Sequence, residues 1–282
     1  MPNILYIKIS QEGQEICLSE RKEKELPRET GTCCSEGKLN QQKKLLAFVR
    51  DHENFAVHLP MLQIMIGTGF RCGELIGLTW KGVGMKKRTV SVDYQPTYKN
   101  YGDGCNFHKT LPKIQAGVRM FPMSKMVGKA FETQRRLNFQ LGIPRDVEID
   151  GLSDFIFMSR SGCPMMPSVV NFILRDIVKT YNEEERERAK REKREPKDMP
   201  HISAHILRHT ACTRMAETDL DIKVVQYVMG HANISVTMDV YNHVTDQERS
   251  SGRLPNWMRF RSCKGVCHAL REQARSVATG VV

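Results

Sequence analysis

The chain has 282 residues, of which 40% are hydrophobic, and its 43 Lys and Arg outnumber its 32 Asp and Glu, for a formal net charge of +11. This length suffices for one large domain or two small ones. The basic excess indicates either a polyanionic partner, most commonly nucleic acid, or an ordinary basic protein. No apolar run reaches the ~18 residues of a membrane-spanning helix, and MPNILYIKIS lacks the pattern of a signal peptide. We therefore expect a cytoplasmic protein without membrane contact.

The nine cysteines are scattered along the chain in an odd number, which favours free thiols in a reducing compartment. Cys263, Cys267 and His268 form a C-x3-C-H cluster without an obvious fourth ligand. We expect no metal site at this cluster, because structural zinc sites are nearly always four-coordinate.

The periodicity of apolar residues predicts a mostly helical α+β fold with a small antiparallel sheet. Residues 1–38 are weakly patterned, and regular structure is expected from residue 39. Strands are predicted at 88–94 and 117–123, with a Gly/Pro/Asn-containing stretch between them, and a short extended piece at 154–159. Helices are predicted at 39–52, 56–66, 71–80, 125–142, 168–185, 203–217, 221–229 and roughly 235–241.

Side chains that can accept a hydrogen bond from the first helical turn precede several of these helices. The expected caps are Ser124, Ser203, Asp219 or Asp221, and Ser235. Residues 183–198 hold seven acidic and seven basic residues, so the run is neutral. It predicts a solvated helical extension with i,i+4 ion pairs, such as Glu184 with Arg188, that ends in a loop at Pro196.

The segment SAHILRHTACTRMAE at 203–217 places His205 and Arg208 on one face of a helix. A guanidinium donates two parallel N–H groups to a phosphate, and an imidazole can donate one more or move a proton. An isolated H-x-x-R is more often an incidental surface pair, but polar residues elsewhere add to this one. GTGFRCGELIGLTW places Arg71 after a double-glycine turn, with Glu74 one helical turn later, and VMGHANISVTMDVYNHV holds His231 and Tyr241.

The order and spacing of these motifs, together with Lys113 in LPKIQAGVRMFP, resemble the tyrosine recombinases of the phage integrase family. The segments HILRHT, MGHANISVTMDVY and AGVRMFPM are most similar in sequence to integrases of phages and integrative elements of Gram-positive bacteria. The resemblance covers roughly residues 39–250, which predicts a catalytic domain of that fold between an unassigned segment at 1–38 and a basic tail at 251–282. The family's complete N-terminal core-binding domain is not expected in residues 1–38.

The resemblance implies a site-specific DNA recombinase that cuts and rejoins DNA through a covalent 3′-phosphotyrosyl intermediate, without ATP or metal. Tyr241 would be the nucleophile, Arg71 and Arg208 would grip the phosphate, and His205 would accept or share the proton of the tyrosine. Two further roles fall on His231, as a hydrogen-bond donor to the phosphate, and on Lys113, as the general acid for the leaving 5′-oxygen.

The resemblance leaves several alternatives open. Lys109 competes with Lys113 as the general acid, and Glu74 is either a supporting residue for Arg71 or only a helix residue. His209 and His201 are expected to have structural roles, and Tyr227 and Tyr181 to pack.

The implied partners are double-stranded DNA at attachment or element-end sites, further copies of the chain in a homotetramer on that DNA, and DNA-bending accessory proteins. The alternative function is a truncated, non-catalytic DNA-binding remnant of such an integrase. A type IB topoisomerase shares the chemistry but not the integrase-like wording.

Overall fold

The computed structural model describes residues 35–251 apart from 103, 111–117, 144, 146, 160–161 and 218–219, and the side chains of residues 40–242 within that range. Lys113, most of the segment 1–38, nearly all of the tail 251–282 and the C-x3-C-H cluster lie outside the described residues. The division into three segments therefore stays a prediction.

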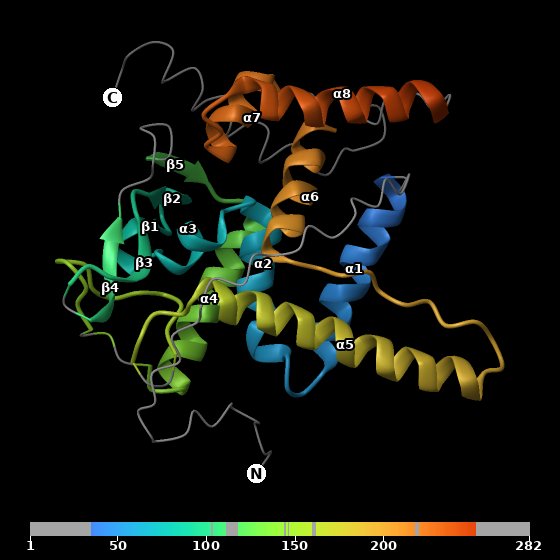
Figure 1. The fold of residues 1–282 in the computed structure, drawn as a ribbon, viewed down its shortest axis with the longest axis horizontal. Coiled ribbons are helices and arrows are strands. Elements are labelled where there is room, and N and C mark those ends of the chain that lie inside the picture. The colour runs from blue at the N-terminus through green and yellow to red at the C-terminus, as the bar shows by residue number, and fades with distance from the viewer. Residues whose placement is uncertain are drawn as a thin grey trace.

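Helices make up most of the described chain, as the sequence predicts (Figure 1). Two short 3-10 helices, η1 (Ala56–His58) and η2 (Trp80–Gly82), precede α2 and β1 respectively. The α-helices are α1 (Ser35–Asp51), α2 (Leu59–Thr68), α3 (Cys72–Ile76), α4 (Lys125–Gln140), α5 (Pro167–Arg191), α6 (Ala204–Ala216), α7 (Ile222–Met229) and α8 (Ile234–Ser251). Within the described ranges, no helix has the length and apolar character needed to cross a bilayer.

Two small antiparallel sheets lie side by side at one edge of the helices (Figure 1). The first sheet has the order β1 (Val83–Gly84), β2 (Thr89–Val92) and β5 (Arg119–Pro122). It confirms the two strands that the sequence predicts. The second sheet is a hairpin of β3 (Gln95–Asn100) and β4 (Cys105–Thr110), in the stretch for which no strand was predicted. Polar and charged residues dominate this hairpin, and it lacks the apolar alternation that marks a half-buried strand.

Helix α2 is the central element of the core because its sequence, LPMLQIMIGT, is apolar on almost every side. It packs against α1, α4 and α6. Its buried residues are Pro60, Met61, Leu62, Ile64, Met65, Ile66 and Thr68. Helix α6 and the residues that follow α2, which carry the candidate site described below, are therefore both held by this buried helix.

Three predicted caps are confirmed and one is wrong. The side-chain oxygens of Ser124, Ser203 and Asp221 each accept a backbone N–H from the first turn of α4, α6 and α7. At α8, Ser235 is not the cap. Its own backbone N–H donates to Asn233 Oδ1 at 3.0 Å. Helix α8 also continues to Ser251, well beyond the predicted end at residue 241.

The charged extension of α5 is helical to Arg191 and protrudes from the body of the molecule (Figure 1). The expected pair of Glu184 with Arg188 does not form, because Arg188 contacts Glu185 at 3.6 Å. The side chain of Glu185 is only 5% exposed and binds Arg194 at 2.6 Å. A single buried carboxylate thus holds the returning loop against the helix, where the sequence predicted a uniformly solvated face.

Candidate active site

Two glycine turns end α2 and α7 close to α6. Gly69 and Gly230 both adopt left-handed backbone conformations, with φ of 66° and 62°, which glycine reaches without a steric penalty. At Gly69 space is also short, because an added Cβ would lie 3.0 Å from the Cβ of Ala211 on α6. The turns leave the last carbonyl groups of α2 and α7 free to accept hydrogen bonds from two arginine side chains, Arg208 and Arg71.

Arg71 and Arg208 each bind the carbonyl group of a glycine turn that is distant in sequence. Arg71, which follows the first turn, donates from Nη2 to the carbonyl oxygen of Gly230 in the second turn at 2.9 Å. Arg208 on α6 donates from Nη1 to the carbonyl oxygen of Gly69 at 2.8 Å and from Nη2 to that of Met229. The C-terminal carbonyls of helices carry partial negative charge, so both guanidinium groups satisfy and neutralise helix ends. Segments distant in sequence are thereby joined at one point.

Glu74 is the buried carboxylate that holds the arginines together. It accepts the backbone N–H of Arg71 at 2.9 Å and the Nη1 of the same residue at 2.8 Å. On its other side, Arg119 donates to Oε1 at 3.1 Å and to Oε2 at 2.9 Å. Arg119 also donates from Nε to the carbonyl oxygen of Val228 at 2.8 Å. Glu74 therefore contacts Arg71 directly, as expected of a supporting residue.

Arg119 was not singled out from the sequence, although it lies within the quoted AGVRMFPM. It is only 3% exposed and starts the otherwise apolar strand β5. A lone arginine in a buried apolar strand was the available signal, because such a charge is retained in a core only with a partner.

The cluster carries excess positive charge, with three guanidinium groups around one carboxylate. Burial by itself would raise the pKa of Glu74, but its hydrogen bonds and ion pairs with Arg119 and Arg71 outweigh that effect and hold the pKa below its ordinary value. Burial and the nearby Arg71 lower the pKa of Arg208 to about 10. Arg208 is still charged at neutral pH, and an anion in front of it would relieve both penalties.

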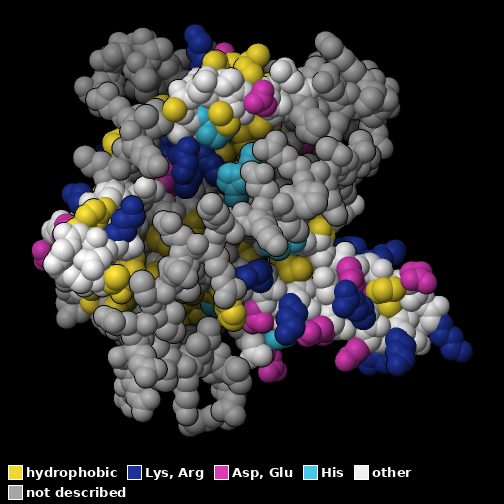
Figure 2. Space-filling model, viewed as in Figure 1, with side chains coloured by type: hydrophobic (Ala, Val, Ile, Leu, Met, Phe, Trp, Pro, Cys, Tyr) yellow, Lys and Arg dark blue, Asp and Glu magenta, His cyan; other side chains and the backbone are white. Residues whose placement is uncertain are grey.

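A cavity of about 660 Å³ opens in front of these residues. It brings together four of the predicted site residues, Arg71, His205, Arg208 and His231. The other lining residues are Cys72, Asn171, Ala204, His209, Cys212, Met229, Ala232, Asn233, Val236 and Val240. Figure 2 shows basic and histidine side chains lying next to one another on this face of the molecule, below the layer of α7 and α8. Arg71, with 41% of its side chain exposed, is more accessible than Arg208, with 7%.

His231 lies at the start of the segment that leads from α7 into α8. Its Nδ1 is 3.0 Å from the hydroxyl of Thr237, which is fully buried. Burial, together with the charges of Arg208 and Arg71, lowers its pKa to about 4. His231 is therefore neutral at pH 7 and can donate a hydrogen bond to an anion, but it does not add a charge.

Tyr241 is not among the residues that line the cavity. Its hydroxyl donates to the carbonyl oxygen of Leu220, before α7, at 2.7 Å, and its ring packs against the main core. Of the two candidate lysines, Lys113 lies outside the described residues. Lys109 is on β4, where its Nζ lies 5.6 Å from the centre of the Tyr94 ring and does not line the cavity.

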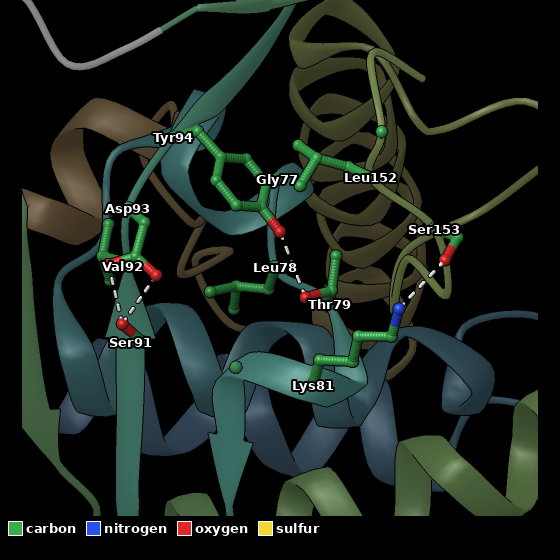
Figure 3. A pocket seen from close by; sticks show the side chains of 12 residues that line it. Gly77, Leu78, Thr79, Lys81, Ser91, Val92, Asp93, Tyr94, Leu152 and Ser153 are labelled. Carbon is green, nitrogen blue, oxygen red and sulfur yellow. Dashed lines mark hydrogen bonds between the residues drawn. The ribbon is translucent and has the colours of Figure 1, made fainter. Parts of the chain in front are cut away.

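A second cavity, of about 360 Å³, lies between the first sheet and residues 151–153 (Figure 3). Its polar groups pair with one another. The hydroxyl of Tyr94 donates to Thr79 at 3.1 Å, and Lys81 lies 3.5 Å from Ser153. None of the predicted site residues lines it. In the described part of the chain, no group of three or more His, Cys, Asp or Glu side chains is arranged to hold a metal ion.

A fold that directs two arginines and two histidines into one cavity suits the binding of a phosphodiester. The sequence pattern of the Phage integrase family matches residues 38–248, and the chain belongs to this family. This confirms the resemblance predicted from the sequence, and the α+β fold class is confirmed as well.

The chain is 33% identical over 205 residues to the transposase from transposon Tn916 of Enterococcus faecalis, which covers 73% of this chain and 47% of that protein. The transposase from transposon Tn1545 of Streptococcus pneumoniae matches with the same values. The chain thus spans about half the length of these curated relatives.

Solved structures of the Tn1549 transposon integrase share the fold. The complex with transposon right end DNA is 32% identical with a TM-score of 0.62, over 75% of this chain and 63% of that one. The complex with circular intermediate DNA has a TM-score of 0.63, over 75% of this chain and 64% of that one. XerA recombinase, at 18% identity and a TM-score of 0.52, shares the fold alone.

Proposed function

We propose that the chain is a site-specific DNA recombinase that cuts and rejoins DNA through a covalent 3′-phosphotyrosyl intermediate. The observation that carries the proposal is the shared cavity, in which Arg71 comes from the α2–α3 turn, His205 and Arg208 from α6, and His231 from the α7–α8 turn. Membership of the Phage integrase family over residues 38–248 supports it. Residues 39–250 would form the catalytic domain.

In the proposed reaction the hydroxyl of Tyr241 attacks a DNA phosphorus, the bond to the 5′-oxygen breaks, and a 3′-phosphotyrosine forms. One ester replaces another, so the step requires no ATP. Arg71 and Arg208 stabilise the negative charge that develops on the non-bridging oxygens. His205 takes the proton from the tyrosine, and Lys113 protonates the leaving oxygen.

His231 would add a hydrogen bond to the phosphate. In the DNA-free chain, burial and the neighbouring arginines lower its pKa to about 4. The arginine cluster around Glu74 would keep the two phosphate-binding arginines in place before DNA arrives. No step of this scheme draws on a metal ion, and we predict that cleavage does not require one.

Double-stranded DNA at attachment or element-end sites is the proposed substrate, and a homotetramer on DNA, together with DNA-bending accessory proteins, is the proposed assembly. The net charge of +11 is consistent with a polyanionic ligand. The related Tn1549 integrase has been solved with transposon right end DNA and with circular intermediate DNA. We expect binding to weaken steeply as salt rises, since phosphate contacts release counterions. The proposed site of action is the bacterial cytoplasm.

One observation favours a second candidate, a DNA-binding chain that does not cut. The hydroxyl of Tyr241 is hydrogen-bonded to Leu220 outside the cavity, so cleavage requires α8 to shift or the tyrosine to rotate. A chain that never makes this movement would bind sites without reacting.

The two candidates are separated by trapping the intermediate. The chain is incubated with a nicked duplex that carries the end of its own element, so that the cleaved fragment diffuses away, and the products are denatured in detergent. A recombinase gives a covalent protein–DNA adduct that Tyr241→Phe abolishes and Tyr227→Phe leaves intact. A chain that binds the duplex but yields no adduct is the non-catalytic protein.

A further inference from the structure

His209 follows Arg208 in the segment HILRHT and lies one helical turn after His205 on α6. The Nε2 atoms of the two imidazoles are 2.8 Å apart, and the rings meet edge to face with their centres 4.4 Å apart. Both side chains are exposed and both line the cavity with the arginines. A nitrogen–nitrogen distance of this length is a hydrogen bond, so one ring donates from Nε2 and the other accepts.

We propose that His209 is a positioning residue for the reaction, which accepts the Nε2–H of His205 and so leaves the Nδ1 lone pair of His205 available to the substrate. The inference rests on the proposed function, in which His205 takes a proton. A neutral imidazole carries its hydrogen on one nitrogen only, and the hydrogen bond at one nitrogen decides what the other can do. If Nε2 of His205 donates to His209, Nδ1 is the base.

The same hydrogen bond becomes stronger during the reaction. When Nδ1 of His205 takes the proton from Tyr241, His205 becomes an imidazolium and its Nε2–H donates to a neutral His209. Hydrogen bonds from charged donors are roughly twice as strong as neutral ones. His209 thus acts as the third group that orients a general base, in a nucleophile–base–orienter arrangement.

Protonation of His209 would end this arrangement, since its Nε2 would then carry a hydrogen and could not accept one. Arg71 and Arg208 also face this cavity, together with His231, Cys72 and Cys212. Arg208, His231 and the two cysteines keep their charge state between pH 5 and 8. The pKa of His231 is lowered to about 4, that of Cys72 is raised to about 11 and that of Cys212 is raised. The pKa of Arg208 is about 10.

Two variants separate the hydrogen bond from the side chain's bulk. His209→Gln keeps an acceptor oxygen near the place of Nε2 but does not titrate, whereas His209→Leu removes the acceptor. We expect His209→Leu to slow single-turnover cleavage by about tenfold to a hundredfold, the worth of a hydrogen bond to a charged group, with unchanged DNA affinity. His209→Gln should keep most of the rate at pH 8.

A second readout requires no cleavage. Long-range hydrogen–nitrogen NMR correlations report which ring nitrogen of His205 carries hydrogen. We expect Nε2–H in the unaltered chain and in His209→Gln, and a mixture in His209→Leu, with His201→Gln as the control on an exposed histidine before α6. An Nδ1–H form in the unaltered chain, or a spectrum that His209→Leu does not change, overturns the proposal. Failure of the proposed function looks different, because the unaltered chain then gives no Tyr241-dependent adduct.

Discussion

Arg208 and Tyr241 lie on α6 and α8, two helices that pack against each other, yet the fold holds the two side chains in opposite ways. Arg208 is 6% exposed and fixed by the carbonyl groups of two helix ends, so it faces the cavity without any ligand. Tyr241 makes its hydrogen bond away from the cavity, to Leu220. The hydrogen bond to Leu220 contributes only about 0.5–1.5 kcal/mol, and the ring also packs against the core, so releasing the tyrosine costs both contributions. In the proposed reaction, the arginines that would bind the phosphate are thus positioned in advance, and Tyr241, the proposed nucleophile, has to move.

The largest effect is expected from the buried ion pair behind the arginines. Arg119→Met leaves Glu74 buried with one partner fewer, and we expect unfolding free energy to fall by about 3–5 kcal/mol. The matched control is Arg145→Met, which breaks the exposed pair of Arg145 with Asp154 at 2.7 Å and should cost less than about 1 kcal/mol. Urea unfolding measures both. Equal losses of unfolding free energy in the two variants would show that the buried pair of Arg119 with Glu74 stabilises the fold no more than an exposed pair does.

Substitution of either arginine that we propose to bind the phosphate should affect the rate more than the fold. Arg71→Lys and Arg208→Lys keep the charge but lose the planar fork. We expect the rate of adduct formation to fall by about 10²–10³, which corresponds to ~3–4 kcal/mol. Arg214→Lys, on the same helix as Arg208 and bound to Gln42 at 2.7 Å outside the cavity, is the control. If Arg214→Lys slows cleavage as much as Arg71→Lys or Arg208→Lys does, the prediction is wrong.

The acid sensitivity of the fold gives a third test. The pKa values of His231 and His58 are both lowered by burial to about 4, from ordinary values of 6.5. Between pH 4 and 6.5 the unfolded chain binds more protons than the folded chain. The contribution of these two histidines to the unfolding free energy is therefore fully present above pH 6.5 and is lost as pH falls toward 4. Unfolding free energies measured at pH 7, 5.5 and 4.5 should decrease in that order.

Asparagine variants assign this slope to its sources. His231→Asn and His58→Asn should each flatten the pH dependence, whatever they do to stability at pH 7. Measurements down to pH 4.5 exclude the effect of Glu185. Its pKa is lowered from 4.5 to about 2, so its contribution to the unfolding free energy is lost only below pH 4.5. A slope that neither variant changes would mean that these histidines are accessible to solvent.

The smallest effect concerns the position of the Tyr241 hydroxyl in the DNA-free chain. Tyr241→Phe removes the hydroxyl that donates to the carbonyl oxygen of Leu220, and in the absence of DNA it should lower unfolding free energy by about 1 kcal/mol. Calorimetry of the DNA-free chain can measure this. If the variant is as stable as the unaltered chain, the hydroxyl is not held outside the cavity.

The sequence predicted the elements whose apolar pattern is strong and missed those whose pattern is polar. Helix α2 and strands β2 and β5 were predicted because burial imposes a regular apolar period on them. The hairpin of β3 and β4 is largely exposed, so hydrophobicity gave no signal. The correct partner of Arg188 was missed because i,i+3 and i,i+4 neighbours on a helix are equally close, and the loop that buries Glu185 decides between them.

The candidate site was predictable as a set of residues but not as a geometry. Motif order pointed to four residues that the structure brings to one cavity, Arg71, His205, Arg208 and His231. The sequence marked Arg119 only as a lone charge in an apolar strand, and it could not show that the buried partner of this charge is Glu74. Nor could it reveal the tyrosine's hydrogen bond, which depends on how α8 packs beside the carbonyl of Leu220.

The most direct test of the central claim is to identify the atom that DNA becomes attached to. The adduct formed with nicked DNA is digested with protease and nuclease, and the nucleotide-bearing peptide is sequenced by mass spectrometry. We predict a phosphodiester link on Tyr241, which would place its hydroxyl at the phosphate held by Arg71 and Arg208. A link on Tyr227 or any other residue, or DNA that is bound but never linked, would contradict it.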